Sequence, residues 1–185
     1  LFGWVSYQTA TKLAEHKRRL QVMSTRDGMT GVYNRRHWET MLRNEFDNCR
    51  RHNRDATLLI IDIDHFKSIN DTWGHDVGDE AIVALTRQLQ ITLRGSDVIG
   101  RFGGDEFAVI MSGTPAESAI TAMLRVHEGL NTLRLPNTPQ VTLRISVGVA
   151  PLNPQMRHYR EWLKSADLAL YKAKKAGRNR TEVAA

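Results

Sequence analysis

The sequence predicts an α/β fold, a sandwich in which helices flank a single β-sheet. Apolar runs rich in β-branched residues, such as Ala56–Asp62, have the length and composition of strands. Segments with apolar residues at helical spacing lie between these runs, without internal repeats or low-complexity tracts. The chain has 185 residues, of which 41% are hydrophobic. That size and composition suit one globular domain with a full core.

The first predicted element is a helix from Tyr7 to Met23, since this segment holds neither Gly nor Pro. Asp27–Tyr33 is rich in turn residues and separates it from a second helix, which Asn34 can cap. We therefore expect residues 1–26 to form a linker or signalling helix and residues 27–185 to form the domain. The apolar positions of the second helix are Trp38, Met41, Leu42, Phe46 and Cys49.

Next, Ala56–Asp62 is expected to form one buried strand, because its apolar run is nearly continuous. A short helical turn and a helix from Gly78 to Leu93 follow. Asp97–Phe102 and Phe107–Met111 carry the β-branched and aromatic residues of strands. We expect these two strands to form a hairpin that turns at Gly103-Gly104, where adjacent glycines can adopt positive φ.

The remaining elements continue the alternation of helices and strands. We expect a helix at Pro115–Leu133, a strand at Val141–Ala150 and a last helix at Tyr159–Ala176. The buried stripe of the last helix would comprise Trp162, Leu163, Ala166, Leu170 and Ala173.

Two groups of carboxylates stand at the ends of predicted strands. Asp105 and Glu106 lie at the expected hairpin tip, and Asp62 and Asp64 end the buried run. The two-residue period of a strand places Asp62 and Asp64 on one face. Adjacent like charges repel unless a cation stands before them, so the two groups together would supply oxygen ligands for Mg²⁺. For Asp64, an N-cap of the next helix is an equal alternative.

Composition narrows the possible partners. The formal net charge is +6, but the Lys and Arg residues are dispersed, and no nucleic-acid recognition motif is present. A bound polyphosphate accounts for the basic run Lys172–Arg180 as well as DNA would. The single Cys49 excludes an intramolecular disulfide and is expected to serve packing. No apolar run reaches the length of a membrane span, and the absence of an initiator Met suggests a fragment.

Five segments in order identify a family. The chain resembles the GGDEF domain of diguanylate cyclases, which join two GTP molecules into cyclic di-GMP. The resemblance runs from Asp27 to about Arg180 and implies a central, mostly antiparallel sheet flanked by helices, as in nucleotide cyclases and polymerase palm domains, with a GGDEF β-hairpin. The matching segments are DGMTGVYNRR at 27–36, DIDHFKSIND at 62–71, GHDVGDEAI at 74–82, RFGGDEF at 101–107 and YKAKKAGRN at 171–179.

The resemblance implies a metal site. Asp62, the backbone carbonyl of Ile63 and Asp105 would bind Mg²⁺, or Mn²⁺, with Glu106 beside them. Lys67 would stabilise the transition state and the β- and γ-phosphates, so Asp105 and Lys67 are the implied catalytic residues. A carboxylate bound to a divalent cation is a weak base. We therefore take metal binding as the essential role of Asp105 and a general-base role as a hypothesis.

The resemblance also implies a GTP site in which Asn70 and Asp79 read guanine. A carboxylate accepts hydrogen bonds from the N–H groups of guanine, whereas adenine would leave it unpaired. Taken alone, Asp79 could instead cap a helix. Lys174 and Arg178, four residues apart, would contact phosphates. The other implied substrate-binding residues are Phe66, Lys67, His75, Gly103 and Gly104.

Arg94 and Asp97 match the RxxD motif that in this family binds cyclic di-GMP as an inhibitor. Arginine would grip guanine or phosphate bidentately, and the aspartate would add a contact to guanine. We expect product bound there to restrain productive docking of two domains.

Each domain offers one GTP site and the product requires two, so the resemblance implies a homodimer. GTP and its product are cytoplasmic, and we expect the domain to face the cytoplasm. We expect any membrane contact to come from the missing upstream region, which could anchor the parent chain in the inner membrane. The same region would control the geometry of the dimer.

Four alternatives remain open at this point. The domain could sense cyclic di-GMP through Arg94 and Asp97 without making it, although its GGDEF segment is intact. It could act as an interaction domain that dimerises through the N-terminal helix. It could make a mixed adenine-guanine dinucleotide, against which Asp79 argues. Nucleic-acid binding ranks last.

Overall fold

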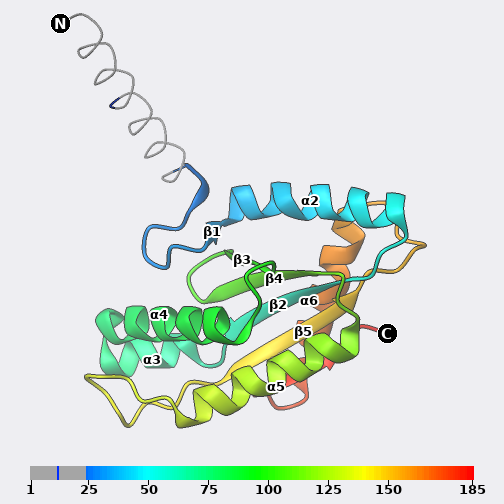
Figure 1. Ribbon diagram of the computed structural model, residues 1–185. Coiled ribbons are helices and arrows are strands. Elements are labelled where there is room, and N and C mark those ends of the chain that lie inside the picture. Colours follow the sequence, from blue (N-terminus) through cyan, green and yellow to red (C-terminus); the bar gives the residue numbers. More distant parts are fainter. Residues whose placement is uncertain (1–11, 13–23) are drawn as a thin grey trace, which may run out of the picture.

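The computed structural model describes Lys12 and residues 24–185 (Figure 1). Apart from Lys12, the predicted helix Tyr7–Met23 lies outside the described residues. Within the described part, no helix is long and apolar enough to cross a membrane.

A six-stranded sheet has the order β1-β3-β4-β2-β5-β6. The three central pairings, β3–β4, β4–β2 and β2–β5, are antiparallel, and the outer pairings β1–β3 and β5–β6 are parallel. The mostly antiparallel sheet expected from the resemblance is thus confirmed. The strands are β1 Tyr33–Asn34, β2 Ala56–Ile63, β3 Val98–Arg101, β4 Glu106–Ser112, β5 Ile145–Pro151 and β6 Arg180–Val183.

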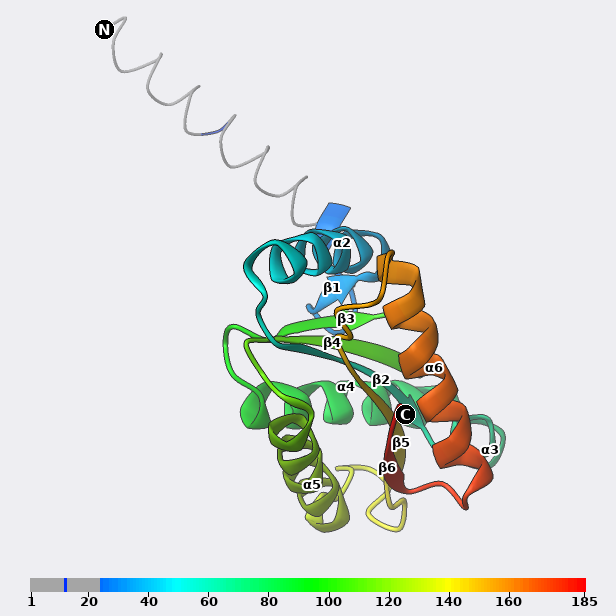
Figure 2. The ribbon, with the colours of Figure 1, turned by 90° about the vertical axis from the view of Figure 1, so that its right-hand side faces the viewer.

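Helices cover both faces of this sheet (Figure 2). In β2, Leu58 and Ile60 pack under α2 and α6, whereas Leu59 and Ile61 pack under α4 and α5. This alternation buries both faces of the central strand, as its continuous apolar run predicts. The helices are α2 Arg35–His52, α3 Phe66–Trp73, α4 His75–Thr92, α5 Ala116–Thr132 and α6 Tyr159–Lys175.

Several predicted boundaries are confirmed by local contacts. The Asn34 side chain accepts a hydrogen bond from the His37 amide and caps α2. Cys49 is buried in the core as expected, and burial raises the pKa of its thiol to about 12. Gly148 lets α6 approach β5 closely, because a Cβ there would overlap the backbone of Ala166 and Leu170.

Other boundaries differ from the predictions. Helix α4 begins at His75, three residues before Gly78, and β5 begins at Ile145 rather than Val141. The short edge strands β1 and β6 were not predicted, because strands of two and four residues carry no measurable periodicity. They exist because the neighbouring strands β3 and β5 offer hydrogen-bonding edges.

Candidate functional site

The two predicted groups of carboxylates meet at one end of the sheet. Asp62 of β2 lies directly opposite Glu106 of β4. Both side chains lie on the face that α6 covers, since Ile60 and Ala108, two residues away, pack in that layer. From α6, Lys174 places its Nζ 2.9 Å from Asp62 Oδ2. Pairing across the sheet thus brings together charges that lie far apart in sequence.

The carboxylates of this end are crowded. Burial raises the pKa of Asp62, and the nearby charges of Asp105 and Asp64 raise it further, while Lys174 opposes the shift. Burial also raises the pKa of Glu106, with further contributions from the charges of Asp167 and Asp62. Like charges in a partly dry site favour binding of a cation.

Asp167 of α6 was missed by sequence reasoning. Burial raises its pKa and Arg35 of α2 opposes the shift. It lies seven residues before Lys174, two turns along the same helix face. That spacing was the available signal, but a single Asp on a helix is usually a solvated residue.

The hairpin differs from the predicted one. Neither Gly103 nor Gly104 has positive φ, and Glu106 is the first residue of β4 rather than part of the tip. The connection spans residues 102–105, longer than the two-residue turn that adjacent glycines suggested. Arg101 instead holds the loop, donating to the carbonyl of Gly104 at 2.8 Å.

Two further contacts place this loop. The other end of the Arg101 guanidinium forms an ion pair with Asp27 at 3.2 Å, which ties the hairpin to the turn before β1. The carbonyl of Asp105 accepts a hydrogen bond from the Ile63 amide at 3.2 Å. Asp105 is therefore anchored through its backbone beside the two residues that end β2.

Asp64 is buried and does not cap α3, because the N-cap position belongs to His65. The N-cap interpretation is therefore wrong. Its carboxylate instead accepts hydrogen bonds from Ser146 Oγ at 2.6 Å and from the Asn179 amide at 2.8 Å.

Helices α3 and α4 carry the residues expected to bind the nucleotide. The Asn70 Oδ1 atom is buried without a hydrogen-bond partner. It packs onto Gly78, where any side chain would overlap it, and Phe66 lies against the same glycine. Lys67 is exposed in the first turn of α3, and His75 is the first residue of α4. An orphaned buried acceptor is a group that a ligand can satisfy.

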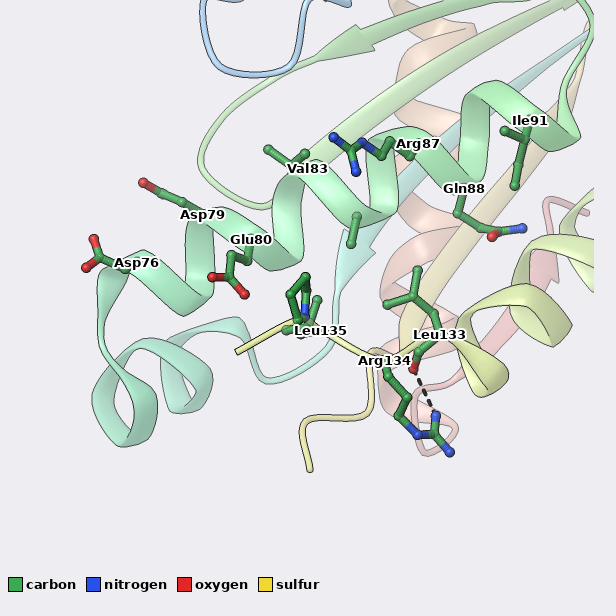
Figure 3. A pocket seen from close by; sticks show the side chains of 12 residues that line it. Asp76, Asp79, Glu80, Val83, Arg87, Gln88, Ile91, Leu133, Arg134 and Leu135 are labelled. Carbon is green, nitrogen blue, oxygen red and sulfur yellow. Dashed lines mark hydrogen bonds between the residues drawn. The ribbon is translucent and has the colours of Figure 1, made fainter. Parts of the chain in front are cut away.

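Asp79 lies inside α4, so it is not an N-cap. It lines a pocket of about 600 Å³ between α4 and the segment after α5. Figure 3 shows Asp79 and Glu80 projecting from α4, with Glu80 on the side of Leu135. The Asn137 amide donates to Glu80 Oε1, whereas Oε2 is buried without a partner.

The predicted inhibitory pair is also brought together. Asp97 Oδ2 accepts a hydrogen bond from the Arg94 amide at 2.8 Å, and burial raises the pKa of Asp97. Both residues line a pocket of about 230 Å³. Arg125 of α5 lines the same pocket, which the sequence did not reveal because 28 residues separate it from Asp97.

The oxygen donors at the end of β2 fit a hard divalent cation. Asp62 and Asp105 are close enough that their charges interact, and the Ile63 backbone adjoins both. Within Lys12 and residues 24–185, no three His, Cys, Asp or Glu side chains are arranged as a ready-made metal site. Two carboxylates and a carbonyl suit Mg²⁺, which usually completes its shell with substrate phosphates and water.

Comparison with known proteins agrees with this geometry. A family model described as diguanylate cyclase, GGDEF domain, matches residues 24–180. The chain belongs to the GGDEF domain family. The family expectation is thereby confirmed, together with its mixed α/β fold. GGDEF diguanylate cyclases in general depend on a divalent metal.

Two relatives illustrate the range of this GGDEF family. Diguanylate cyclase DosC of Escherichia coli is 35% identical over 159 residues, which cover 85% of this chain and 34% of DosC. Cyclic di-GMP phosphodiesterase NbdA of Pseudomonas aeruginosa is 30% identical over 193 residues, covering 97% of this chain and 25% of NbdA. This GGDEF domain thus spans about a third or less of these relatives.

A solved structure resembles nearly the whole chain. It is the coiled coil and GGDEF domain of DgcB from Caulobacter crescentus in complex with c-di-GMP. The TM-score is 0.91 at 28% identity, with 97% of this chain and 95% of the DgcB chain covered.

Proposed function

We propose that this GGDEF domain condenses two GTP molecules into cyclic di-GMP and releases two pyrophosphates. The observation that supports this most is the convergence of Asp62, Asp105 and Lys174 at the end of β2. Diguanylate cyclase relatives such as DosC make the same reaction the first expectation.

In this proposal, Asp62, Asp105 and the Ile63 carbonyl hold Mg²⁺ or Mn²⁺, with Glu106 beside them. A bound divalent cation would lower the pKa of the attacking 3′-hydroxyl and neutralise the leaving pyrophosphate. Lys67 at the start of α3 would bind the β- and γ-phosphates. Phe66, Gly103 and Gly104 would frame the triphosphate with their backbone groups.

Arg178 would bind a phosphate of the substrate. Lys174 would bind phosphate as well, once its ammonium group leaves Asp62. Asn70 and Asp79 would read guanine, with His75 at the nucleotide. The buried, partnerless Asn70 Oδ1 supports this role, because a bound ligand would relieve the cost of leaving it unpaired.

Two domains, each holding one GTP, would have to face each other. The proposed arrangement is therefore a homodimer that works in the cytoplasm, where GTP is available, with any membrane contact supplied by chain upstream of this domain. Cyclic di-GMP would inhibit by binding at Arg94 and Asp97, and the presence of Arg125 in the same pocket supports an anionic ligand there.

A second candidate is a sensor that binds cyclic di-GMP without making it. The pocket at Arg94 and Asp97 favours it, as does the similarity to NbdA, a cyclic di-GMP phosphodiesterase. We rank the cyclase above the sensor because both carboxylates proposed to bind the metal, Asp62 and Asp105, are present.

The deciding experiment incubates the protein with GTP and Mg²⁺ at several protein concentrations and separates the nucleotides by chromatography. Cyclic di-GMP that appears at a rate rising faster than linearly with protein concentration would support both cyclase activity and the dimer. Tight cyclic di-GMP binding without any product at any concentration would favour the sensor.

A further inference from the structure

The carboxylate of Asp64 joins three parts of the domain that are distant in sequence. Asp64 follows β2 directly, two residues after Asp62, and is 6% exposed. One oxygen accepts from the hydroxyl of Ser146 in β5 at 2.6 Å. The other accepts from the backbone amide of Asn179, in the loop between α6 and β6, at 2.8 Å. The residue therefore fixes that loop relative to the strand end that carries Asp62.

The loop has an unusual backbone. Gly177, Arg178 and Asn179 have φ values of 113°, 63° and 47°, so three consecutive residues lie in the left-handed region. Residues with a side chain normally avoid this region, and such conformations persist where surrounding contacts hold them. The Arg178 amide donates to the Ala173 carbonyl at 3.0 Å, which closes the end of α6.

The next amide along the loop, that of Asn179, donates a hydrogen bond to the Asp64 carboxylate. A charged acceptor in a buried position forms a strong hydrogen bond with a backbone amide. No other described contact joins the Asn179 amide to the end of β2. Loss of the carboxylate would leave the buried Ser146 hydroxyl and the half-buried Asn179 amide without this acceptor.

We propose that Asp64 is a positioning residue, which acts through Arg178. By holding the left-handed loop, it sets where the Arg178 guanidinium meets the triphosphate of a nucleotide whose metal lies on Asp62. This inference rests on the proposed function, because it takes a nucleoside triphosphate as the ligand. Asp64 itself touches neither nucleotide nor metal in this role.

The test measures binding of 3′-deoxy-GTP with Mg²⁺ by calorimetry, because this analogue lacks the hydroxyl that would react. Asp64→Ala and Arg178→Ala should each weaken binding by about tenfold, the scale of one hydrogen bond to a charged group. The double variant Asp64→Ala/Arg178→Ala should bind as weakly as Arg178→Ala alone. If the two losses of affinity multiplied in the double variant, the proposal would be overturned. Independent effects would mean that Asp64→Ala acts through a general structural defect and not through Arg178.

Two further variants separate positioning from folding. Asp64→Asn retains an acceptor for the Asn179 amide, and its amide group can donate to Ser146, so it should bind like the wild type. Asp64→Leu replaces the carboxylate with an apolar group of similar shape. It removes the same two hydrogen bonds and serves as the second variant should Asp64→Ala fail to fold. A loss of binding in Asp64→Asn as large as in Asp64→Leu would contradict positioning through these hydrogen bonds.

Hydrogen exchange provides a readout without ligand. The Asn179 amide should exchange faster in Asp64→Leu, while Ser146→Ala, which removes only the contact to β5, should leave it protected. An unchanged exchange rate in Asp64→Leu would overturn the proposal. Wild-type protein that fails to bind 3′-deoxy-GTP would instead overturn the proposed function, and with it the phosphate role of Arg178, whatever the exchange rates.

Discussion

Lys174 Nζ lies 2.9 Å from Asp62 Oδ2, so a lysine expected to bind phosphate pairs with a carboxylate expected to bind metal. The lysine side chain is 35% exposed and the aspartate side chain 17% exposed. The contact is therefore only partly shielded from water and can be exchanged for another partner. Under the proposed function, Lys174 and a divalent cation would compete for the same Asp62 oxygen.

This competition predicts opposite effects of Lys174→Gln on two ligands. Affinity for Mn²⁺ alone should rise about two- to fivefold, the scale of one partly exposed ion pair. Affinity for 3′-deoxy-GTP should fall, because a phosphate contact is lost. Electron paramagnetic resonance measures free Mn²⁺, and Lys172→Gln on the exposed face of α6 is the control. Unchanged Mn²⁺ affinity would show that Lys174 does not compete with the metal.

Asp105→Asn tests whether metal binding or proton transfer is the essential role of that residue. Because the Asp105 backbone is fixed by Ile63, the variant should keep its fold. We expect Mn²⁺ affinity and cyclic di-GMP synthesis to fall together, since an amide is a poorer ligand than a carboxylate. Intact metal affinity with lost turnover would favour the general-base role instead.

The ion pair between Arg101 and Asp27 predicts a pH-dependent contribution to stability. Burial acts to raise the pKa of Asp27, but hydrogen bonds from Thr30 and Arg101 outweigh it and lower that pKa below its ordinary value of 3.8. A depressed carboxyl pKa stabilises the fold above the unfolded value and loses this effect as pH falls through the folded value.

Asp27→Asn should therefore reduce the free energy of unfolding at pH 7 by about 1 kcal/mol. The difference from wild type should shrink as the pH falls below 3.8 and vanish once the pH is below the lowered pKa of Asp27 in the folded protein. Urea denaturation at a series of pH values measures it, with the exposed Asp47→Asn on α2 as the control. A difference that persists unchanged in acid would mean that the Asp27 charge is not its source.

Gly148→Ala should destabilise the domain by about 3 kcal/mol, because overpacking at a close backbone approach forces elements apart. The new Cβ would overlap the backbone of α6 at Ala166 and Leu170. Gly95→Ala is the matched control, since its Cβ would meet nothing within 4 Å. Equal unfolding free energies for the two variants would refute the role of Gly148 in seating α6.

Arg94→Ala should abolish the late slowdown of cyclic di-GMP synthesis and leave the initial rate unchanged, because the residue lies away from the Asp62 site. Arg125→Ala should do the same, since Arg125 lines the same pocket. Progress curves with added cyclic di-GMP measure the effect, with Arg51→Ala on the exposed face of α2 as the control. A slowdown that survives both variants would place inhibition elsewhere.

Much of this domain could be predicted from the sequence. The β2 run, the Asn34 cap and the long amphipathic helices depend on local spacing, which is visible in the chain. The motif carboxylates could be named because resemblance assigns them one by one. The N-cap interpretation of Asp64 failed because the local sequence does not show the hydrogen bonds that Ser146 and Asn179, distant along the chain, donate to its carboxylate.

The sequence by itself therefore determined the order of the long helices and the four central strands and the identity of the motif residues, since both depend on neighbours within a few positions. Only the tertiary structure decided which of them meet. Strand pairing set Asp62 opposite Glu106, and helix packing brought Asp167, Lys174 and Arg125 to their sites. These contacts join residues far apart in the chain, and their energies arise from burial and charge that exist only once the sheet and its helices are assembled.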